Sequence, residues 1–215
     1  MIFLAIPVEG IIKIVKEFEG IGENTTIVDL GSTKQKIIEA VPESIRQNFI
    51  PAHPMAGTEY SGPTAAFPGL FKDAVVAICD FKESGEIHVK RSVELFSHLG
   101  MKIIFMSAAE HDHHASVISH LPHAISFSLA SSVLKKENKK NIIALSGTGF
   151  NGMIRIAKSS PVMWTDIFKQ NKQNLINSID LFKKELDECE NLVKNEKWDE
   201  LREWMGEARK IREIL

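Results

Sequence analysis

The order of hydrophobic segments constrains the fold of this chain most, because its character changes halfway along. Residues 1–106 alternate short apolar, β-branched runs with segments of helical periodicity. Such alternation predicts a parallel or mostly parallel sheet with helices packed on it. Residues 107–215 have a helical pattern almost throughout. We therefore expect an α/β domain at 1–106 followed by an all-α domain at 107–215.

Local patterns place the individual elements. Apolar runs bounded by turn residues predict strands at 2–6, 25–30, 49–51, 74–79 and 102–106. Apolar residues at helical spacing predict helices at 8–18, 34–41, 87–99, 115–133, 154–157, 162–186 and 198–215. Ser107 and Glu110 have the spacing of a capping box at the start of the helical half. The charged stretch 135–141 reads as an exposed turn, and Pro122 is expected to kink its helix.

Composition limits the classes of function. The 215 residues carry a net charge of −2, which argues against a broad surface for nucleic acid or anionic membrane. No run approaches the ~18 apolar residues of a membrane span, so none is expected. Cys79 and Cys189 form neither a metal-binding spacing nor a disulfide framework. Both read as reduced thiols of a cytoplasmic protein.

The segment 115–133 carries apolar residues on more than one helical face. A helix that is hydrophobic on all sides must be buried on all sides. In a domain of this size a partner subunit is a natural source of that burial. We therefore expect a homodimer formed through the helical half, and the alternative is a monomer with a compact bundle.

The segment 51–62 concentrates chemically useful side chains after a predicted strand. It contains His53, Thr58, Glu59 and two glycines, and loops held by a rigid sheet commonly carry function. A neutral imidazole accepts a proton near neutral pH, so His53 is a candidate general base. The alternative is a histidine that is hydrogen-bonded to the loop backbone. The neighbouring hydroxyl and carboxylate groups are suited to orienting the ring or binding a polar substrate.

Three further sites complete a candidate pocket for a small anionic substrate. His120 and His123 lie on one side of a predicted helix. One interpretation is that His123 faces a ligand. The other is that one of the two histidines caps the helix and the other faces solvent. Their spacing is not a zinc motif, and we expect no metal. Arg155 has apolar neighbours, which predicts a buried guanidinium paired with a substrate carboxylate or with an internal acid. Ser32 follows the second strand, at the edge where ligands of such sheets bind.

Five segments taken together resemble the prephenate dehydrogenase family, and the resemblance runs in order through essentially the whole chain. The segments are Val28-Asp29-Leu30-Gly31-Ser32-Thr33-Lys34, His53-Pro54-Met55-Ala56-Gly57-Thr58-Glu59 with Ser61-Gly62, Met106-Ser107 with Glu110-His111-Asp112, Ser119-His120-Leu121-Pro122-His123, and Phe150 to Ala157 with Trp164. The segment that contains His53, combined with the Ser-His-Leu-Pro-His motif, is highly specific for this family.

The resemblance implies oxidative decarboxylation of prephenate to 4-hydroxyphenylpyruvate with NAD or NADP, in tyrosine biosynthesis. It implies that His53 accepts the proton of the ring hydroxyl and that Ser32 helps to fix His53. His123 and Arg155 would hold the substrate carboxylates, with Glu59 and Thr58 in the pocket. Some relatives prefer arogenate, and Asn151 and Gly152 stand where a charged residue is expected in some of them.

One part of the family pattern is not found here, namely a strand followed by a Gly-x-Gly-x-x-Gly turn and a helix that hold the pyrophosphate. We therefore expect a partial Rossmann-like domain that begins at a later strand, with Pro7, Val8 and Ser32 as what remains of the cofactor site. The expected enzyme is then N-terminally truncated and binds dinucleotide poorly by itself. The alternatives are a non-catalytic, dimerising and substrate-binding remnant or a metal-dependent hydrolase.

Overall fold

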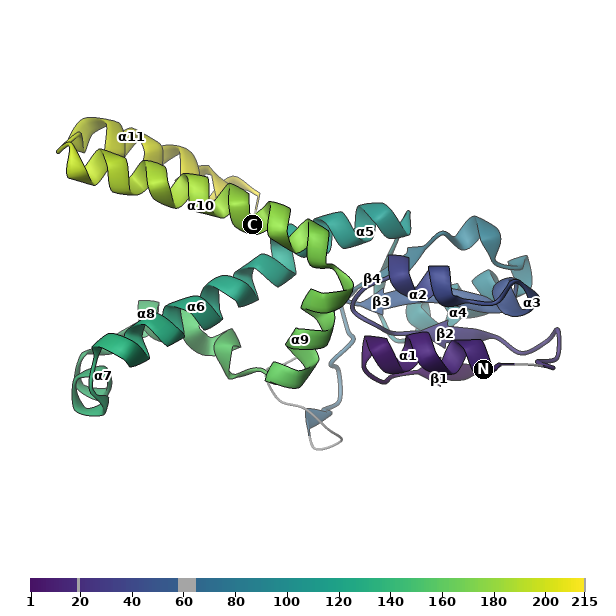
Figure 1. Ribbon diagram of the computed structural model, residues 1–215. Coiled ribbons are helices and arrows are strands. Elements are labelled where there is room, and N and C mark those ends of the chain that lie inside the picture. Colours follow the sequence, from purple (N-terminus) through teal and green to yellow (C-terminus); the bar gives the residue numbers. More distant parts are fainter. Residues whose placement is uncertain (19, 58–64, 215) are drawn as a thin grey trace. The chain divides into compact units, whose positions relative to one another are not determined.

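The computed structural model describes residues 1–18, 20–57 and 65–214. Its first part is a five-stranded sheet in the order β1 (Ile2–Leu4), β2 (Ile27–Asp29), β3 (Phe49–Pro54), β4 (Val75–Cys79) and β5 (Lys102–Met106). All neighbouring strands are parallel except β3 and β4. The mostly parallel sheet and the helical second half confirm the predicted fold class (Figure 1).

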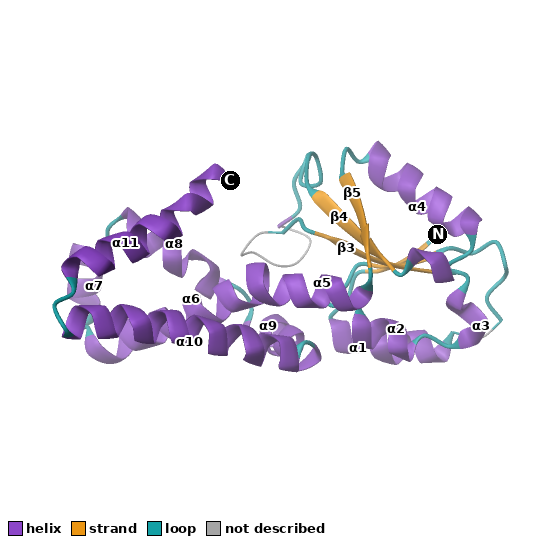
Figure 2. Ribbon diagram, turned by 90° about the horizontal axis from the view of Figure 1, so that it is seen from above, coloured by secondary structure: helices purple, strands orange, loops and turns teal. Residues whose placement is uncertain are grey.

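Helices cover both faces of the sheet (Figure 2). On one face, α1 (Val8–Ile14), α2 (Gln35–Ala40) and α3 (Glu43–Arg46) bury Ile11, Ile37 and Ile45 against β1 to β3. On the other face, α4 (Glu86–His98) buries Phe96 against β2 to β4. The three-residue β1 and β2 and the very short α3, which the pattern did not predict, show that the element boundaries depend on packing as well as on local sequence.

Strand β3 changes partner along its length, and this change positions the site. Residues Phe49 to Pro51 pair with β2, whereas Ala52 to Pro54 pair with β4. His53 therefore lies inside a strand, opposite Ala77, rather than in the loop expected after residue 51. The rigid pairing fixes its backbone.

The helical part begins at Ser107, whose side chain and Glu110 form the predicted capping box. Helix α5 (Ala108–Ala115), a π-helical segment (Ser116–His120) and α6 (Leu121–Lys136) follow one another without a break. Pro122 lies in the first turn of α6, where a missing N–H is tolerated. A π segment, rather than a proline kink, therefore marks the irregularity in this helix.

Several shorter helices follow α6. They are α7 (Lys139–Leu145), α8 (Thr148–Ile154), a 3-10 turn (Arg155–Lys158), α9 (Pro161–Gln170) and α10 (Lys172–Lys194). Residues 135–141, predicted to be a turn, are instead mainly the end of α6 and the start of α7. The helix predicted over 162–186 is interrupted at Asn171, which leaves helical geometry with φ −113° and ψ 34°.

Residues Ile176–Leu215 form a separate compact unit. It holds the later part of α10, α11 (Trp198–Arg209) and a final 3-10 turn. Within it, the Trp204 indole N–H donates to Glu185 at 3.2 Å, and Leu192 is buried. The two helices therefore form a hairpin stabilised by their own contacts.

The segment Ala108–Lys136 is long and apolar enough to cross a membrane by length and composition alone, a test that the core helix of a soluble protein also passes. Its first part packs on the sheet, where Ala108 joins the core around Ala77 and Asp112 is buried. Its later part is largely exposed in the single chain, with Leu134 72% exposed.

Candidate active site

His53 faces the side of the sheet that α5 covers. Cross-strand neighbours share a face, so His53 and its partner Ala77 point the same way. Ala108 packs with Ala77 in one buried cluster. His111 lies three residues further along α5 and so on the same side of that helix. The small side chains of Ala77 and Ala108 thus bring the helix close enough for His111 to reach His53.

The imidazole of His53 belongs to a chain of hydrogen bonds. Its Nδ1 lies 2.9 Å from Nε2 of His111, and Nδ1 of His111 lies 2.8 Å from Oδ1 of Asp112. His111 and Asp112 are buried, whereas His53 is half-buried. The Asp112 carboxylate also accepts the backbone N–H groups of Lys34 at 2.8 Å and Gln35 at 3.0 Å. These contacts tie α5 to the start of α2.

A buried ion pair lies beside this chain. The Lys34 ammonium donates to the Asp29 carboxylate and, at 2.7 Å, to the Ala52 carbonyl. The other Asp29 oxygen accepts the Gly31 N–H at 2.7 Å. Both charged side chains are fully buried. Burial raises the pKa of Asp29, while Lys34 and the Gly31 N–H act in the opposite direction. The pair links β2 to the backbone next to His53.

Burial sets the protonation of the histidines here. It lowers the pKa of His53 well below its ordinary value, and the neighbouring His111, Lys34 and His120 lower it further. Burial likewise lowers the pKa of His120 to about 4, against the opposing effect of the Asp112 carboxylate. Both rings are therefore neutral at neutral pH, as a proton acceptor must be.

A second group of side chains continues from α5 into α9. The Asn171 amide donates to the Asp112 carbonyl at 2.6 Å and to Nδ1 of His120 at 3.2 Å. His123 stacks on Trp164 with 3.5 Å between ring centroids, and its Nδ1 donates to the Ser119 carbonyl at 2.9 Å. His123 is half-buried and His120 buried, so neither is the solvent histidine considered above.

Arg155 lies in the 3-10 turn after α8 and is exposed in the single chain, which corrects the expectation that it is buried. Its charge contributes to lowering the pKa of His123, after the larger effect of burial. The guanidinium is therefore electrostatically coupled to the His123 ring. Its turn follows α8, which is held to α6 by the Ser126 hydroxyl donating to the Met153 carbonyl at 2.7 Å.

Comparison with known proteins identifies the family. Residues 1–105 match the family model described as "Prephenate dehydrogenase, nucleotide-binding domain", and residues 107–207 match "Prephenate dehydrogenase, dimerization domain". The chain belongs to the prephenate dehydrogenase family. The two matches together cover nearly its whole length.

Comparison with individual relatives supports the same prephenate dehydrogenase family assignment. The chain is 32% identical to the prephenate dehydrogenase of Bacillus subtilis strain 168, with all of the chain and 59% of that protein aligned. It is 30% identical to the cyclohexadienyl dehydrogenase of Zymomonas mobilis, over all of the chain and 75% of that protein. A crystal structure of the Aquifex aeolicus prephenate dehydrogenase with hydroxyphenyl propionate and NAD+ superimposes with a TM-score of 0.89 at 32% identity, covering 98% of this chain and 74% of that one. The chain thus spans about three fifths of the Bacillus relative.

The residues expected at the cofactor site of this prephenate dehydrogenase family member lie at the carboxyl ends of β1 and β2. Pro7 is exposed and precedes α1, Ser32 is half-buried, and the Val8 side chain is buried in the core, which leaves its backbone for contact. Ser32 and the Pro7–Val8 segment thus lie at the edge of the sheet where ligands of such folds bind.

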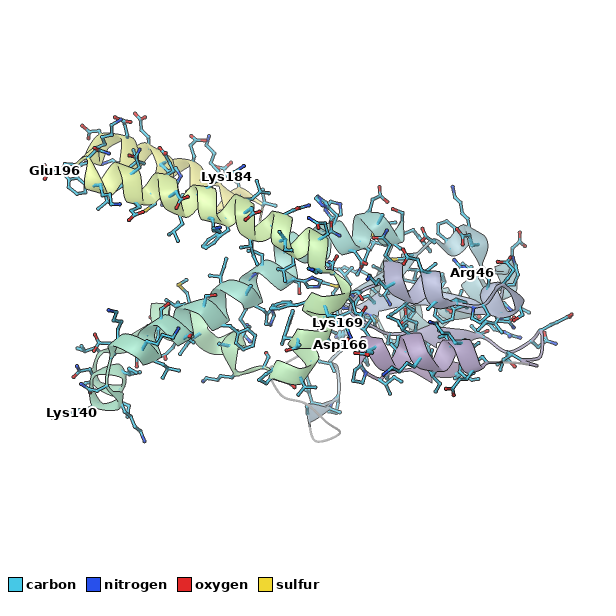
Figure 3. The ribbon with its side chains drawn as sticks, viewed as in Figure 1. Arg46, Lys140, Asp166, Lys169, Lys184 and Glu196 are labelled. Atoms are coloured by element: carbon cyan, nitrogen blue, oxygen red, sulfur yellow. The ribbon has the colours of Figure 1, made fainter. Side chains whose placement is uncertain are left out.

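The same region does not fit a pyrophosphate. The first-turn N–H of Glu9 donates to the Asp166 carboxylate at 3.0 Å, and Lys169 pairs with the Glu9 side chain at 3.0 Å (Figure 3). An anion at the start of α1 would meet these carboxylates. The Gly-x-Gly-x-x-Gly string at 147–152 follows helix α7 rather than a strand, so it is not a dinucleotide-binding turn.

Two predicted substrate residues, Thr58 and Glu59, lie outside the described residues. Within the described part of the chain, no group of three or more His, Cys, Asp or Glu side chains is placed to hold a metal ion. No role was predicted for His111, Asp112 or Asn171 from the sequence. The motif Glu110-His111-Asp112 was the available signal, but its link to His53 spans 58 residues and needs the fold.

Proposed function

We propose that this chain carries the catalytic site of a cytoplasmic NAD-dependent prephenate dehydrogenase that makes 4-hydroxyphenylpyruvate for tyrosine biosynthesis. The observation that carries the proposal is the neutral, strand-held His53 with its His111 and Asp112 partners. It lies in a chain that both family models match. Residues 1–106 would form the nucleotide-binding part and 107–215 the helical, substrate-binding part.

His53 is the proposed proton acceptor. As the ring hydroxyl of prephenate loses its proton to the imidazole, hydride leaves the same carbon. An oxidised nicotinamide, held by Ser32 and the backbone at Pro7 and Val8, would supply the acceptor for that hydride. The bond from the ring to its carboxylate then breaks, carbon dioxide departs, and the electron pair aromatises the ring. The resulting phenolate takes the proton back from His53, so the acid–base group is regenerated.

His123 and Arg155 are the proposed anchors of the substrate carboxylates. The charge of Arg155 acts on His123, so the two side chains lie near each other, and an arginine binds a carboxylate with two parallel hydrogen bonds. The stacking of His123 on Trp164 holds that ring in one orientation. Thr58 and Glu59 would complete the pocket, and Ser32 would assist His53.

The nicotinamide end of the cofactor would be held by Ser32 and by the backbone at Pro7 and Val8. NADP in place of NAD is the alternative, because the residue that reads the ribose 2′ position is not identified in this chain. Purified full-length protein that carries this chain should be assayed for reduced nicotinamide with prephenate and arogenate, each with NAD and NADP. Turnover of prephenate with NAD is expected. Turnover only with arogenate would change the substrate, and no turnover with any combination would contradict the proposed function.

We further propose a homodimer through the helical half. In the single chain, α7 and α8 contain no buried residue and α6 buries only Ser126. Large apolar side chains are exposed there, including Leu134 at 72% and Leu145 at 81%. Sedimentation of the full-length protein should show a dimer. Leu134→Glu should shift it toward monomer, while the exposed Lys140→Glu should not, and a wild-type monomer would contradict the proposal.

A further inference from the structure

We propose that His111 and Asp112 act as positioning residues that fix the tautomer of His53, leaving its Nε2 as the proton acceptor. The inference rests on the proposed function and extends it to two residues. It follows from the order of donors and acceptors along the buried chain from Asp112 to His53.

The direction of the hydrogen bonds is set at the Asp112 end. An ionised carboxylate only accepts hydrogen bonds, and Asp112 receives two backbone N–H groups besides the His111 ring. Nδ1 of His111 must therefore carry a proton. With one proton on each ring, Nε2 of His111 is an acceptor. Nδ1 of His53 is then the donor, and its lone pair lies on Nε2.

The anchoring of Asp112 makes this direction persistent. Its two oxygens are held by the N–H groups of Lys34 and Gln35, and its backbone carbonyl by Asn171. The carboxylate cannot turn away without leaving the buried Lys34 N–H unsatisfied, which is costly. Other charged or titratable groups facing His53 are Lys34, from the segment before α2, and His120, from the π segment.

The arrangement also accommodates the proton during turnover. The substrate O–H bond breaks and an N–H bond forms at Nε2 of His53, which makes the ring an imidazolium. Its Nδ1–H remains donated to His111, whose Nδ1–H remains donated to ionised Asp112. A hydrogen bond from a charged donor is stronger than one from a neutral donor, so the chain stabilises the imidazolium until the proton returns to the phenolate.

The first test reads the tautomer directly and needs no substrate. Nitrogen-15 NMR of the histidine-labelled full-length protein, with His53 assigned from a His53→Gln sample, should show a protonated Nδ1 and an unprotonated Nε2. Asp112→Ala removes the acceptor of the His111 Nδ1–H, so the direction of both bonds is no longer set and the His53 proton should divide between Nδ1 and Nε2. The reverse pattern in wild type, or an unchanged pattern in Asp112→Ala, would overturn the proposal.

The second test is kinetic. Asp112→Ala should lower kcat by a factor of up to about 10² to 10⁴, the range for loss of general-base catalysis, with KM little changed. His111→Phe should behave similarly, whereas His111→Gln, whose amide oxygen can accept the His53 N–H, should recover at least about tenfold over His111→Phe. His114→Gln on the exposed side of α5 is the matched control and should match wild type.

The outcomes separate the two proposals. If wild type has no dehydrogenase activity but the NMR pattern is as expected, the proposed function fails and the tautomer assignment stands. If wild type is active and His111→Phe and Asp112→Ala both keep kcat within about twofold, the positioning role fails. Equal losses in His111→Phe and His111→Gln, with unchanged thermal unfolding, would also contradict it. Circular dichroism of each variant checks that the fold is retained.

Discussion

The surroundings of His53 and the helices α6 to α8 differ in how far a single chain satisfies them. Around His53, the Asp112 carboxylate, the His111 ring and the Lys34 ammonium are buried, and each has partners from the same chain. Along α6 to α8, by contrast, apolar side chains such as Leu134 and Leu145 are exposed. The buried groups around His53 therefore have their hydrogen-bond partners within a single chain.

The two regions meet different requirements, proton transfer in the first and binding and assembly in the second. Proton transfer needs a ring held at fixed geometry, which a sheet and its long-range hydrogen bonds provide. Binding a doubly charged substrate and forming a dimer need surface, which the helices leave available. Substitutions near His53 should therefore affect the stability and chemistry of each chain, and substitutions beyond α6 should affect binding and assembly.

The largest expected effect is the loss of stability on breaking the ion pair beside His53. Lys34→Met leaves the Asp29 carboxylate buried without its cation, and breaking such a pair costs about 3–5 kcal/mol. Chemical denaturation should show that loss, and Asp29→Asn combined with Lys34→Met should recover part of it. Exposed Lys36→Met is the control and should change the free energy of unfolding little. If Lys34→Met is as stable as wild type, the Lys34–Asp29 ion pair does not stabilise the fold around His53.

The next effect is a dependence of stability on pH at His120. The folded state keeps His120 neutral down to a pKa of about 4, whereas the unfolded chain protonates near ~6.5. The stability from the neutral ring is therefore present above pH ~6.5 and is lost as pH falls toward about 4, by roughly 3 kcal/mol. Denaturation of His120→Gln should show a shallower decline than wild type between these pH values. Identical slopes would contradict the assignment.

The smallest effect concerns the helical part. Arg155→Ala should raise KM for prephenate by about 10-fold, the equivalent of ~1.4 kcal/mol, with kcat largely kept, because a binding interaction common to ground and transition states is lost. Lys158→Ala, exposed in the same 3-10 turn, serves as the control. An unchanged KM in Arg155→Ala would remove this residue from the substrate site and weaken the contrast between the two regions.

Features with a local cause were predictable from the sequence. β-Branched runs predicted the buried strand Ile27–Asp29, and the Ser107 and Glu110 spacing predicted the capping box. The break at Asn171 was missed because no glycine or proline marks it. It is stabilised instead by hydrogen bonds from its side chain to Asp112 and His120, which are 59 and 51 residues away.

The same distinction between local and long-range causes applies to the candidate site. His53 stood out by its residue type and position after a strand, although the pairing of β3 with β4 places it within a strand. Its partner His111 depends on the small residues Ala77 and Ala108, which let α5 approach the sheet. Arg155 was expected to be buried from its apolar neighbours, but Ile154 and Ile156 are only half-buried and the Arg155 side chain itself is exposed in the single chain.

The most direct test of the central claim, that a neutral His53 accepts the substrate proton, is the pH profile of kcat/KM for prephenate with NAD. Only the neutral ring accepts a proton, and burial holds the pKa of His53 well below its ordinary value. Activity should therefore stay level from neutral pH downward and fall only below the ordinary histidine range of ~6.5. The profile should be lost with His53→Asn. A limb at or above ~6.5, or the same profile in His53→Asn, would contradict the account.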